Sequence, residues 1–314
     1  MKKCFLLYYL VFNTICAFGQ KTEQYFTWNW KPCALPDARF VAITEKQDSL
    51  WHRKDYYLRS GYLQMEGHYH EAAAKVEEGV FQYYHANGQL QSTGAYRQGK
   101  KEGTWISYHP NGLLSDSVIY QQGNVVGTRL RFYANGYMLD SSIWKADGSG
   151  IQVSWFDNGN PSQAGYYAAG SKQHGKWQYF HTNGKVSALE VYDQGALVNK
   201  SYFGEDGQPL TDTTNRDIEA LFPGGDKAWA NYLYKNLYFP TQFQITNSDK
   251  AVVVVDWVVD EEGRVGNVNV YSSFHPEFDK IAVKIIQNSP KWKPAVQHNR
   301  KIKAYRRQPI TFQQ

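Results

Sequence analysis

The chain has 314 residues, of which 16% are aromatic and 26 are glycine, and its formal net charge is +5. This length allows two domains with a sizeable core, and a composition rich in aromatic residues and glycine is typical of β-structure with many turns. So small a net charge does not indicate a nucleic-acid partner, and we expect none.

Residues 1–19 have the pattern of a secretory signal peptide. Lys2 and Lys3 precede an apolar run, and Ala17 and Gly19 place small residues before an expected cleavage after residue 19. An uncleaved anchor and a lipoprotein at Cys16 are the alternatives. Cleavage predicts a periplasmic or other cell-envelope protein, with outer-membrane association as a further expectation. The mature chain then keeps one thiol, Cys33, which cannot form an internal disulfide.

After a lead-in segment, residues 20–55, one short phrase recurs through residues 56–210. An Asn-Gly or Asp-Gly pair returns at steps of 23 to 25 residues, and an aromatic residue stands three positions before each pair. The pairs begin at Asn87, Asn111, Asn135, Asn158, Asn183 and Asp206, and the aromatics are Tyr84, Tyr108, Phe132, Trp155, Phe180 and Phe203. A fixed period in this range is the signature of a repeat array.

Each repeat is predicted to be a β-hairpin. Asn-Gly favours a type I′ turn, in which both residues have positive φ, and a looser glycine-bearing turn leads to the next unit. A lone hairpin is marginally stable in water, so we expect stacked hairpins to bury the aromatic residues that precede the turns.

The units resemble MORN-type repeats, in particular the variant found in YwqK-type antitoxin proteins. The residues that carry the likeness most fully are Gly103, Trp105, Tyr108, Asn111, Gly112 and Leu114. The resemblance implies a meander of stacked β-hairpins. It is specific for architecture and does not identify a function, because such repeats serve as scaffolds and binding surfaces in unrelated settings.

Histidines recur in the array without the spacing of a metal site. His85, His109 and His181 each stand two residues before an Asn-Gly pair, and their repeats lie about 10 Å apart, too far for a shared ion. A surface role beside the turn is the prediction for all three. His68 and His70 form a pair without a visible third ligand. No metal, cofactor or catalytic residue is therefore expected.

The polar linker at residues 211–221 leads into a different pattern over residues 222–314. A helix ending near Tyr238-Phe239-Pro240 is followed by two strands, an amphipathic helix at Phe278 to Ile286 and a final strand to Phe312. This order predicts a small α+β domain in which two helices cover a three-stranded antiparallel sheet.

The segment from Phe222 to Phe312 resembles the C-terminal domain of the TonB family, in the form common among Bacteroidetes. The phrases that match include "FPGGDKAWANYL", "VVVDWVVDEEGRVGNVNV", "SPKWKPA" and "QPITF". The resemblance implies a periplasmic domain that binds a short peptide of an envelope protein, such as an outer-membrane receptor, by β-strand addition.

The chain departs from the pattern of TonB transducers because its leader is expected to be cleaved and its sequence has no proline-rich tract. The prediction is a non-enzymatic envelope protein that binds proteins or peptides. The alternatives are an accessory transducer in TonB-dependent transport, an antitoxin-like inhibitory repeat protein and an unrecognised enzyme, although no catalytic motif is present.

The candidate partner-binding residues lie at two places in the C-terminal segment. They are Tyr238 and Pro240 in the turn after the first helix, and Lys303, Tyr305 and Arg307 on the final strand. The basic stretch at residues 291–307 has two interpretations: a charged edge strand that resists aggregation, or a contact for acidic partners or anionic lipid headgroups. The second would allow peripheral membrane association.

Overall fold

The computed structural model describes residues 21–245 and 250–314. The predicted signal peptide lies outside these residues. Fifteen strands form one antiparallel sheet in which the strands follow in chain order. They are β1 (Lys21–Phe26), β2 (Phe40–Gln47), β3 (Leu50–Tyr57), β4 (Leu63–Tyr69), β5 (Glu77–Tyr84), β6 (Leu90–Arg97), β7 (Lys100–Tyr108), β8 (Leu114–Gln121), β9 (Asn124–Phe132), β10 (Met138–Trp144), β11 (Gly150–Trp155), β12 (Pro161–Ala168), β13 (Lys172–Phe180), β14 (Val186–Asp193) and β15 (Ala196–Tyr202).

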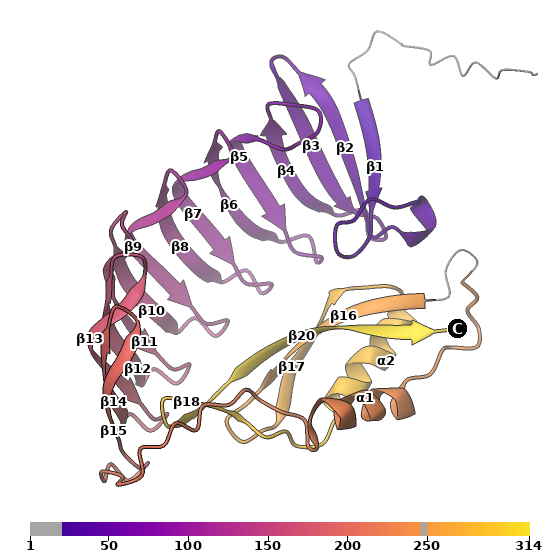
Figure 1. Ribbon diagram of the computed structural model, residues 1–314. Helices are drawn as coiled ribbons and strands as arrows, with labels where there is room; N and C mark the ends of the chain where they lie inside the picture. Colours follow the sequence, from indigo (N-terminus) through magenta and orange to yellow (C-terminus); the bar gives the residue numbers. More distant parts are fainter. Residues whose placement is uncertain (1–20, 246–249) are drawn as a thin grey trace, which may run out of the picture.

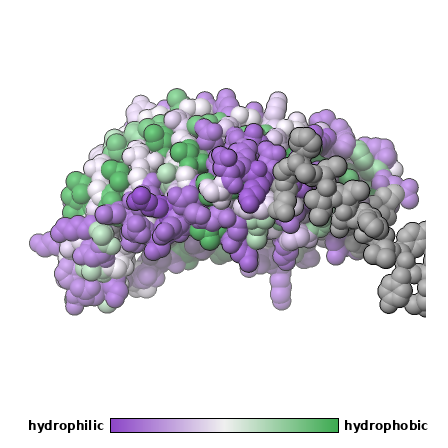
Figure 2. All heavy atoms as spheres, turned by 90° about the horizontal axis from the view of Figure 1, so that it is seen from above, coloured by the Kyte–Doolittle hydropathy of each residue, from purple (hydrophilic) through white to green (hydrophobic). Residues whose placement is uncertain are grey.

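This sheet, the array, bends into an arc, and the C-terminal domain lies on the inner side of the arc (Figure 1). A short 3-10 helix, η1 (Leu35–Asp37), lies between β1 and β2. The lead-in segment contributes β1, β2 and most of β3 to the same sheet. Seen from above in Figure 2, hydrophobic residues lie in small groups among hydrophilic ones. The meander of hairpins expected from the repeats is confirmed.

The Asn-Gly turns differ from the type I′ prediction. The Gly112 N–H donates to the His109 carbonyl at 2.8 Å, and Gly112 has φ of 83°, whereas Asn111 is not among the residues with positive φ. This is a type I turn followed by a left-handed glycine, the three-residue hairpin loop with a bulge. Asn111 keeps ordinary φ and uses its side chain instead: Oδ1 accepts the Leu113 N–H at 3.1 Å.

Type I′ turns occur at the opposite edge of the array. Gln98 and Gly99 have φ of 51° and 73°, and Gln122 and Gly123 have 53° and 85°. Each pair joins directly adjacent strand ends, as in the register Arg97↔Lys100. The Gln-Gly turns that the sequence pattern marked as looser are therefore the tight ones.

The Asn side chains also join each repeat to the next. Each Nδ2 donates to a backbone carbonyl 22 to 24 residues further along the chain, at distances from 2.7 to 3.0 Å. The pairs are Asn87 with Pro110, Asn111 with Ala134, Asn135 with Asp157, Asn158 with Thr182, and Asn183 with Glu205. One side chain thus closes its own turn and binds the neighbouring one.

Replacing Asn111 with aspartate is expected to lower the free energy of unfolding by about 1–3 kcal/mol, since the donor to Ala134 is lost and an acceptor oxygen takes its place. Chemical denaturation would measure the loss. Asn215→Asp is the matched control, because the Asn215 side chain accepts the Asp217 N–H in the linker. Equal midpoints for both variants would contradict a stabilising role of this inter-repeat bond.

The core of the array consists of aromatic rings packed over glycines. Trp105 and Trp177 are 3% and 1% exposed. A Cβ atom at Gly94 or Gly165 of the preceding strand would lie 2.2 or 2.1 Å from the respective indole. Both tryptophans stand six residues before an Asn-Gly pair, whereas the aromatics three residues before the pairs, such as Phe180, are only half-buried. The expectation that the aromatics three residues before the pairs form the core is therefore wrong. The buried tryptophans stand three residues earlier in the repeat.

The C-terminal domain has the predicted composition of two helices and a three-stranded sheet. The helices are α1 (Gly225–Asn236) and α2 (Pro276–Gln287), and the strands are β16 (Lys250–Val259), β17 (Val265–Ser272) and β20 (Ala304–Gln313) in the order β17-β16-β20. Buried Val253, Val255, Phe278, Ile286 and Phe312 belong to its core. A small hairpin that was not predicted, β18 (Ala295–Gln297) with β19 (Arg300–Ile302), precedes β20. No helix in the described ranges is long and apolar enough to cross a membrane.

Candidate functional site

One edge of the C-terminal sheet carries the final strand. β20 pairs with β16 without a register shift, and Pro309 stands opposite Val254. Proline within a sheet is tolerated where its missing N–H would face away from the partner strand. Because backbone groups alternate along a strand, the N–H groups of Tyr305, Arg307 and Thr311 face the same free edge.

The three predicted residues near the start of β20 have different surroundings. Tyr305 is 71% exposed. Arg307 donates to Asp256 at 3.1 Å and lies over the Tyr271 ring, 3.5 Å from its centroid. Lys303 forms an ion pair with Asp157 of the array. Both basic side chains are therefore already engaged in ion pairs, and Tyr305 is the most exposed of the three.

The predicted turn after α1 does not join these residues. Pro240 is buried, and Phe239 packs against Phe278 in the helix-covered core. Tyr238 is 63% exposed. Tyr305 and Arg307, by contrast, alternate with the core residues of β20 and lie on the other face of the sheet. The structure therefore separates the two parts of the predicted site.

The β18–β19 hairpin attaches the domain to the end of the array. Its turn residues His298 and Asn299 both have positive φ. The His298 ring stacks on Tyr179 with centroids 3.6 Å apart, and its Nδ1 lies 2.9 Å from the buried Glu190 carboxylate. Asn299 Nδ2 donates to the Phe203 carbonyl at 2.9 Å. Burial opposes ionisation of Glu190, but hydrogen bonds from His298 and Tyr192 outweigh it and lower its pKa.

A second contact lies at the other end of the arc. The Arg39 guanidinium is 4.5 Å from the Phe274 ring centroid, and Arg59 donates to Ser273 Oγ at 3.4 Å. Both arginines belong to loops that flank β2 and β3. The C-terminal domain thus touches the arc near both of its ends, which agrees with its place inside the curve (Figure 1).

Between the array and the start of β20 is a pocket of about 220 Å³. The array and the C-terminal domain both line it. The lining residues are Arg131, Tyr133, Leu139, Gln152, Ser154, Trp155, Phe156, Asp157, Ser162 and Gln163 from the array, and Glu261, Arg300, Ile302, Lys303 and Tyr305 from the C-terminal domain. We call it the interdomain pocket.

Arg300 is the most deeply buried charge in the interdomain pocket, with 7% of its surface exposed. Its Nη1 donates to the carbonyls of Ser162 and Phe180. Its Nε has no hydrogen-bond partner in the described part of the chain, and no carboxylate there forms an ion pair with it. Burial lowers the pKa of Arg300 to about 10.

The other charges of the interdomain pocket are mostly paired. Lys303 pairs with Asp157, and Arg131 pairs with the buried Asp140. Glu261 has no ion pair among residues 21–245 and 250–314, and burial raises the pKa of its carboxyl group. Among the described residues, the pocket therefore offers one buried cation without a counter-ion.

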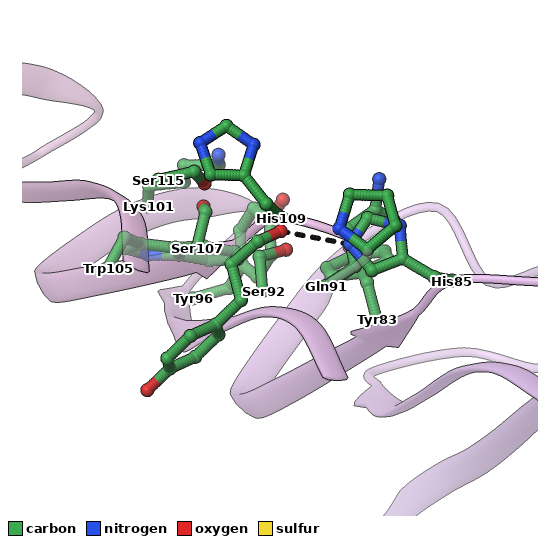
Figure 3. Close-up of a pocket in the computed structure, with 12 residues that line it drawn as sticks. Tyr83, His85, Gln91, Ser92, Tyr96, Lys101, Trp105, Ser107, His109 and Ser115 are labelled. Atoms are coloured by element: carbon green, nitrogen blue, oxygen red, sulfur yellow. Dashed lines mark hydrogen bonds between the residues drawn. The ribbon is translucent and has the colours of Figure 1, made fainter. Parts of the chain in front are cut away.

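A larger pocket, of about 410 Å³, lies on the array alone (Figure 3). Trp105, Tyr83 and Tyr96 belong to its lining, and Lys101 Nζ is 4.1 Å from the Trp105 ring centroid. Burial lowers the pKa of Lys101. The dashed line in Figure 3 joins His85 Nε2 to the carbonyl of Tyr108 in the next repeat, at 2.9 Å.

Each turn-flanking histidine contacts a backbone carbonyl of the next repeat. His109 and His181 contact the carbonyls of Phe132 and Phe203 at 2.8 and 2.9 Å, as His85 does with Tyr108. His181 is buried. The predicted surface role is therefore wrong for His181, whereas His85 and His109 stay half-buried beside their turns. No group of three potential metal ligands occurs in the described ranges.

Sequence reasoning missed His298, Asn299 and Arg300 as contact residues. Arg300 was counted only as one of several cations in a basic stretch. The sequence signal was the His298-Asn299 pair between two short extended segments, since both residue types tolerate positive φ. Nothing in the sequence indicated that this hairpin meets the array.

Comparison with protein families agrees with these two parts of the chain. Residues 236–313 match the family described as Gram-negative bacterial TonB protein C-terminal. Residues 77–98 and 173–194 match the MORN repeat variant. No curated protein matches the chain. Both families consist of non-enzymatic kinds of domain, and the TonB-type domain indicates protein interaction at the cell envelope.

Proposed function

We propose that this chain, which joins MORN-variant repeats to a TonB-type C-terminal domain, is a non-enzymatic, periplasmic peptide-binding protein of the cell envelope. Its ligand is an extended segment of an envelope protein, for example of an outer-membrane receptor, that adds as a strand to the free edge of β20. The repeat array holds the domain in place and limits the approach to that edge.

The observation that carries this proposal is the position of β20 in its sheet. β20 is a ten-residue strand at the sheet edge. An edge strand presents unpaired N–H and C=O groups to which a peptide can add, with main-chain hydrogen bonds supplying affinity and alternate side chains supplying selectivity. Exposed Tyr305 lies on this strand beside the interdomain pocket.

Replacing Tyr305 with proline is expected to weaken peptide binding at least about tenfold, since it removes an N–H that faces the free edge and restricts the strand. Extended peptides selected on the full chain from a random ten-residue display library would serve as ligands. Fluorescence anisotropy would then compare the dissociation constants of the two proteins.

Tyr305→Ala is the matched control, because it removes the same side chain and keeps the backbone donor. Strand addition predicts that the proline variant loses much more affinity than the alanine variant. Equal losses would locate the ligand on the Tyr305 side chain rather than on the backbone. Selected peptides that bind both variants like the native chain would exclude β20 as the site.

A further inference from the structure

The interdomain pocket adds a chemical preference to the proposed strand addition. We infer that this pocket binds a carboxylate, carried as an aspartate or glutamate side chain by the peptide that lies along β20, and that Arg300 is the residue that binds it. This inference rests on the proposed function for the identity of the carrier, and on the pocket alone for the chemistry.

The state of Arg300 is the first reason. Removing a guanidinium from water is costly unless ionic or hydrogen-bond partners replace the water. Arg300 is 7% exposed, and its guanidinium lies over the Phe156 and Tyr179 rings, 5.3 and 5.4 Å from their centroids. Its hydrogen-bond acceptors within the described residues are two backbone carbonyls, both at Nη1. Its buried Nε has no acceptor in the described part of the chain. A carboxylate could accept from a guanidinium through charge-assisted hydrogen bonds.

The size of the pocket is the second reason. Its volume of about 220 Å³ is below the roughly 300 Å³ at which small-molecule sites begin. It therefore suits one side chain of a longer ligand better than a complete metabolite. Ile302, Lys303 and Tyr305 line the pocket at the start of β20, so a strand along the free edge would reach it with a residue at one end.

The surrounding charges do not supply another anion site. Asp157 already pairs with Lys303 and Asp140 with Arg131. Arg307, the other predicted basic contact on β20, pairs with Asp256 and stacks on Tyr271. Glu261 also lines the pocket, and burial raises its pKa, so a nearby carboxylate would further favour its neutral form. Arg300 is thus the cation that an acidic side chain could reach without displacing an ion-pair partner.

The test uses the full chain and a matched pair of small probes. N-acetyl-glutamate α-amide presents the side-chain carboxylate of an acidic residue, and N-acetyl-glutamine α-amide has the same shape without the charge. The NMR signal of Arg300 Nε–H would be followed during each titration. The glutamate probe is expected to shift this signal and to bind at least about tenfold more tightly than the glutamine probe.

Variants locate the effect. Arg307→Gln removes a basic side chain from the neighbouring strand β20 and should leave the preference for glutamate intact. Arg300→Gln should abolish it. Because Arg300 also holds the array, thermal unfolding must show that this variant remains folded. If it does not, the native chain with the two probes still decides the question.

The outcomes separate this inference from the proposed function. Equal binding of the two probes, or no shift of the Arg300 signal, would overturn the carboxylate site and leave strand addition standing. Glutamate-specific binding at Arg300 together with library peptides that are insensitive to Tyr305→Pro would support the pocket and exclude strand addition. Both proposals together predict selected peptides with an acidic residue at one end.

Discussion

Replacing Trp177 with alanine is expected to lower the free energy of unfolding of the array by about 3–5 kcal/mol. The indole is 1% exposed and lies directly over Gly165. It also meets the Tyr167 and Tyr179 rings, and its Nε1 donates to the Tyr166 carbonyl at 3.0 Å. The array is a single sheet, so no second sheet packs against it that could collapse into the space. Denaturation monitored by circular dichroism would measure the change.

Phe180→Ala is the comparison, because Phe180 is in the same strand, is aromatic and is only half-buried. We expect it to cost clearly less than Trp177→Ala. If both variants cost the same, packing over glycine would not be what distinguishes the core positions. If neither changed stability, the aromatic face would not be the core of the array.

The repeat period could be read from the sequence, but the buried positions could not be read from it alone. The five Asn-Gly pairs from Asn87 to Asn183 each mark a turn between two strands of the array. The hairpins of β1 to β4 carry no such pair, and Asp206-Gly207 follows the last strand of the sheet. Aromatic residues occur both six and three residues before the Asn-Gly pairs, however, and the β-propensity of these residues does not show which position is buried. What decides is the glycine opposite: Gly94 and Gly165 leave room for Trp105 and Trp177. Each of these tryptophan–glycine contacts joins two neighbouring strands, so it can be recognised only once the alignment of those strands is known.

The predicted turn types are the reverse of the observed ones, for a similar reason: the Asn-Gly turns are not type I′, and the Gln-Gly turns are. Asn-Gly favours type I′ when only the two turn residues are considered. In the array, Asn111 instead bonds Leu113 and Ala134 through its side chain. The requirement to join consecutive repeats therefore overrides the local preference, and it falls to Gln98-Gly99 and Gln122-Gly123 to adopt positive φ at both positions.

The candidate site was predicted only in part. A three-stranded sheet with β20 at its edge follows from the order of elements and from Pro309. The interdomain pocket does not follow, because its lining comes from segments more than a hundred residues apart, such as Tyr133 and Arg300. Single-sequence patterns report on neighbours within one element and carry no information on how the two domains meet.

Replacing Glu190 with alanine is expected to weaken the attachment of the C-terminal domain by about 1.5–3 kcal/mol, the cost of losing hydrogen bonds to a charged group. Glu190 is 2% exposed and accepts hydrogen bonds from Tyr192 Oη and His298 Nδ1. Calorimetry should then resolve a separate, earlier transition for the C-terminal domain. Glu205→Ala, at an exposed turn residue, is the control and should leave the unfolding profile unchanged.

The pH dependence of this attachment provides an independent check. The pKa of Glu190 is lowered from its ordinary value of 4.5, so its contribution is fully present above pH 4.5 and is lost as the pH falls through the lower value of the folded state. Glu190→Gln keeps the shape of the side chain and removes its titration. The native chain should therefore approach the Gln variant in stability at acidic pH and exceed it near neutrality. A constant difference between the two over this range would show that hydrogen bonding, and not the charge of Glu190, holds the hairpin against the array.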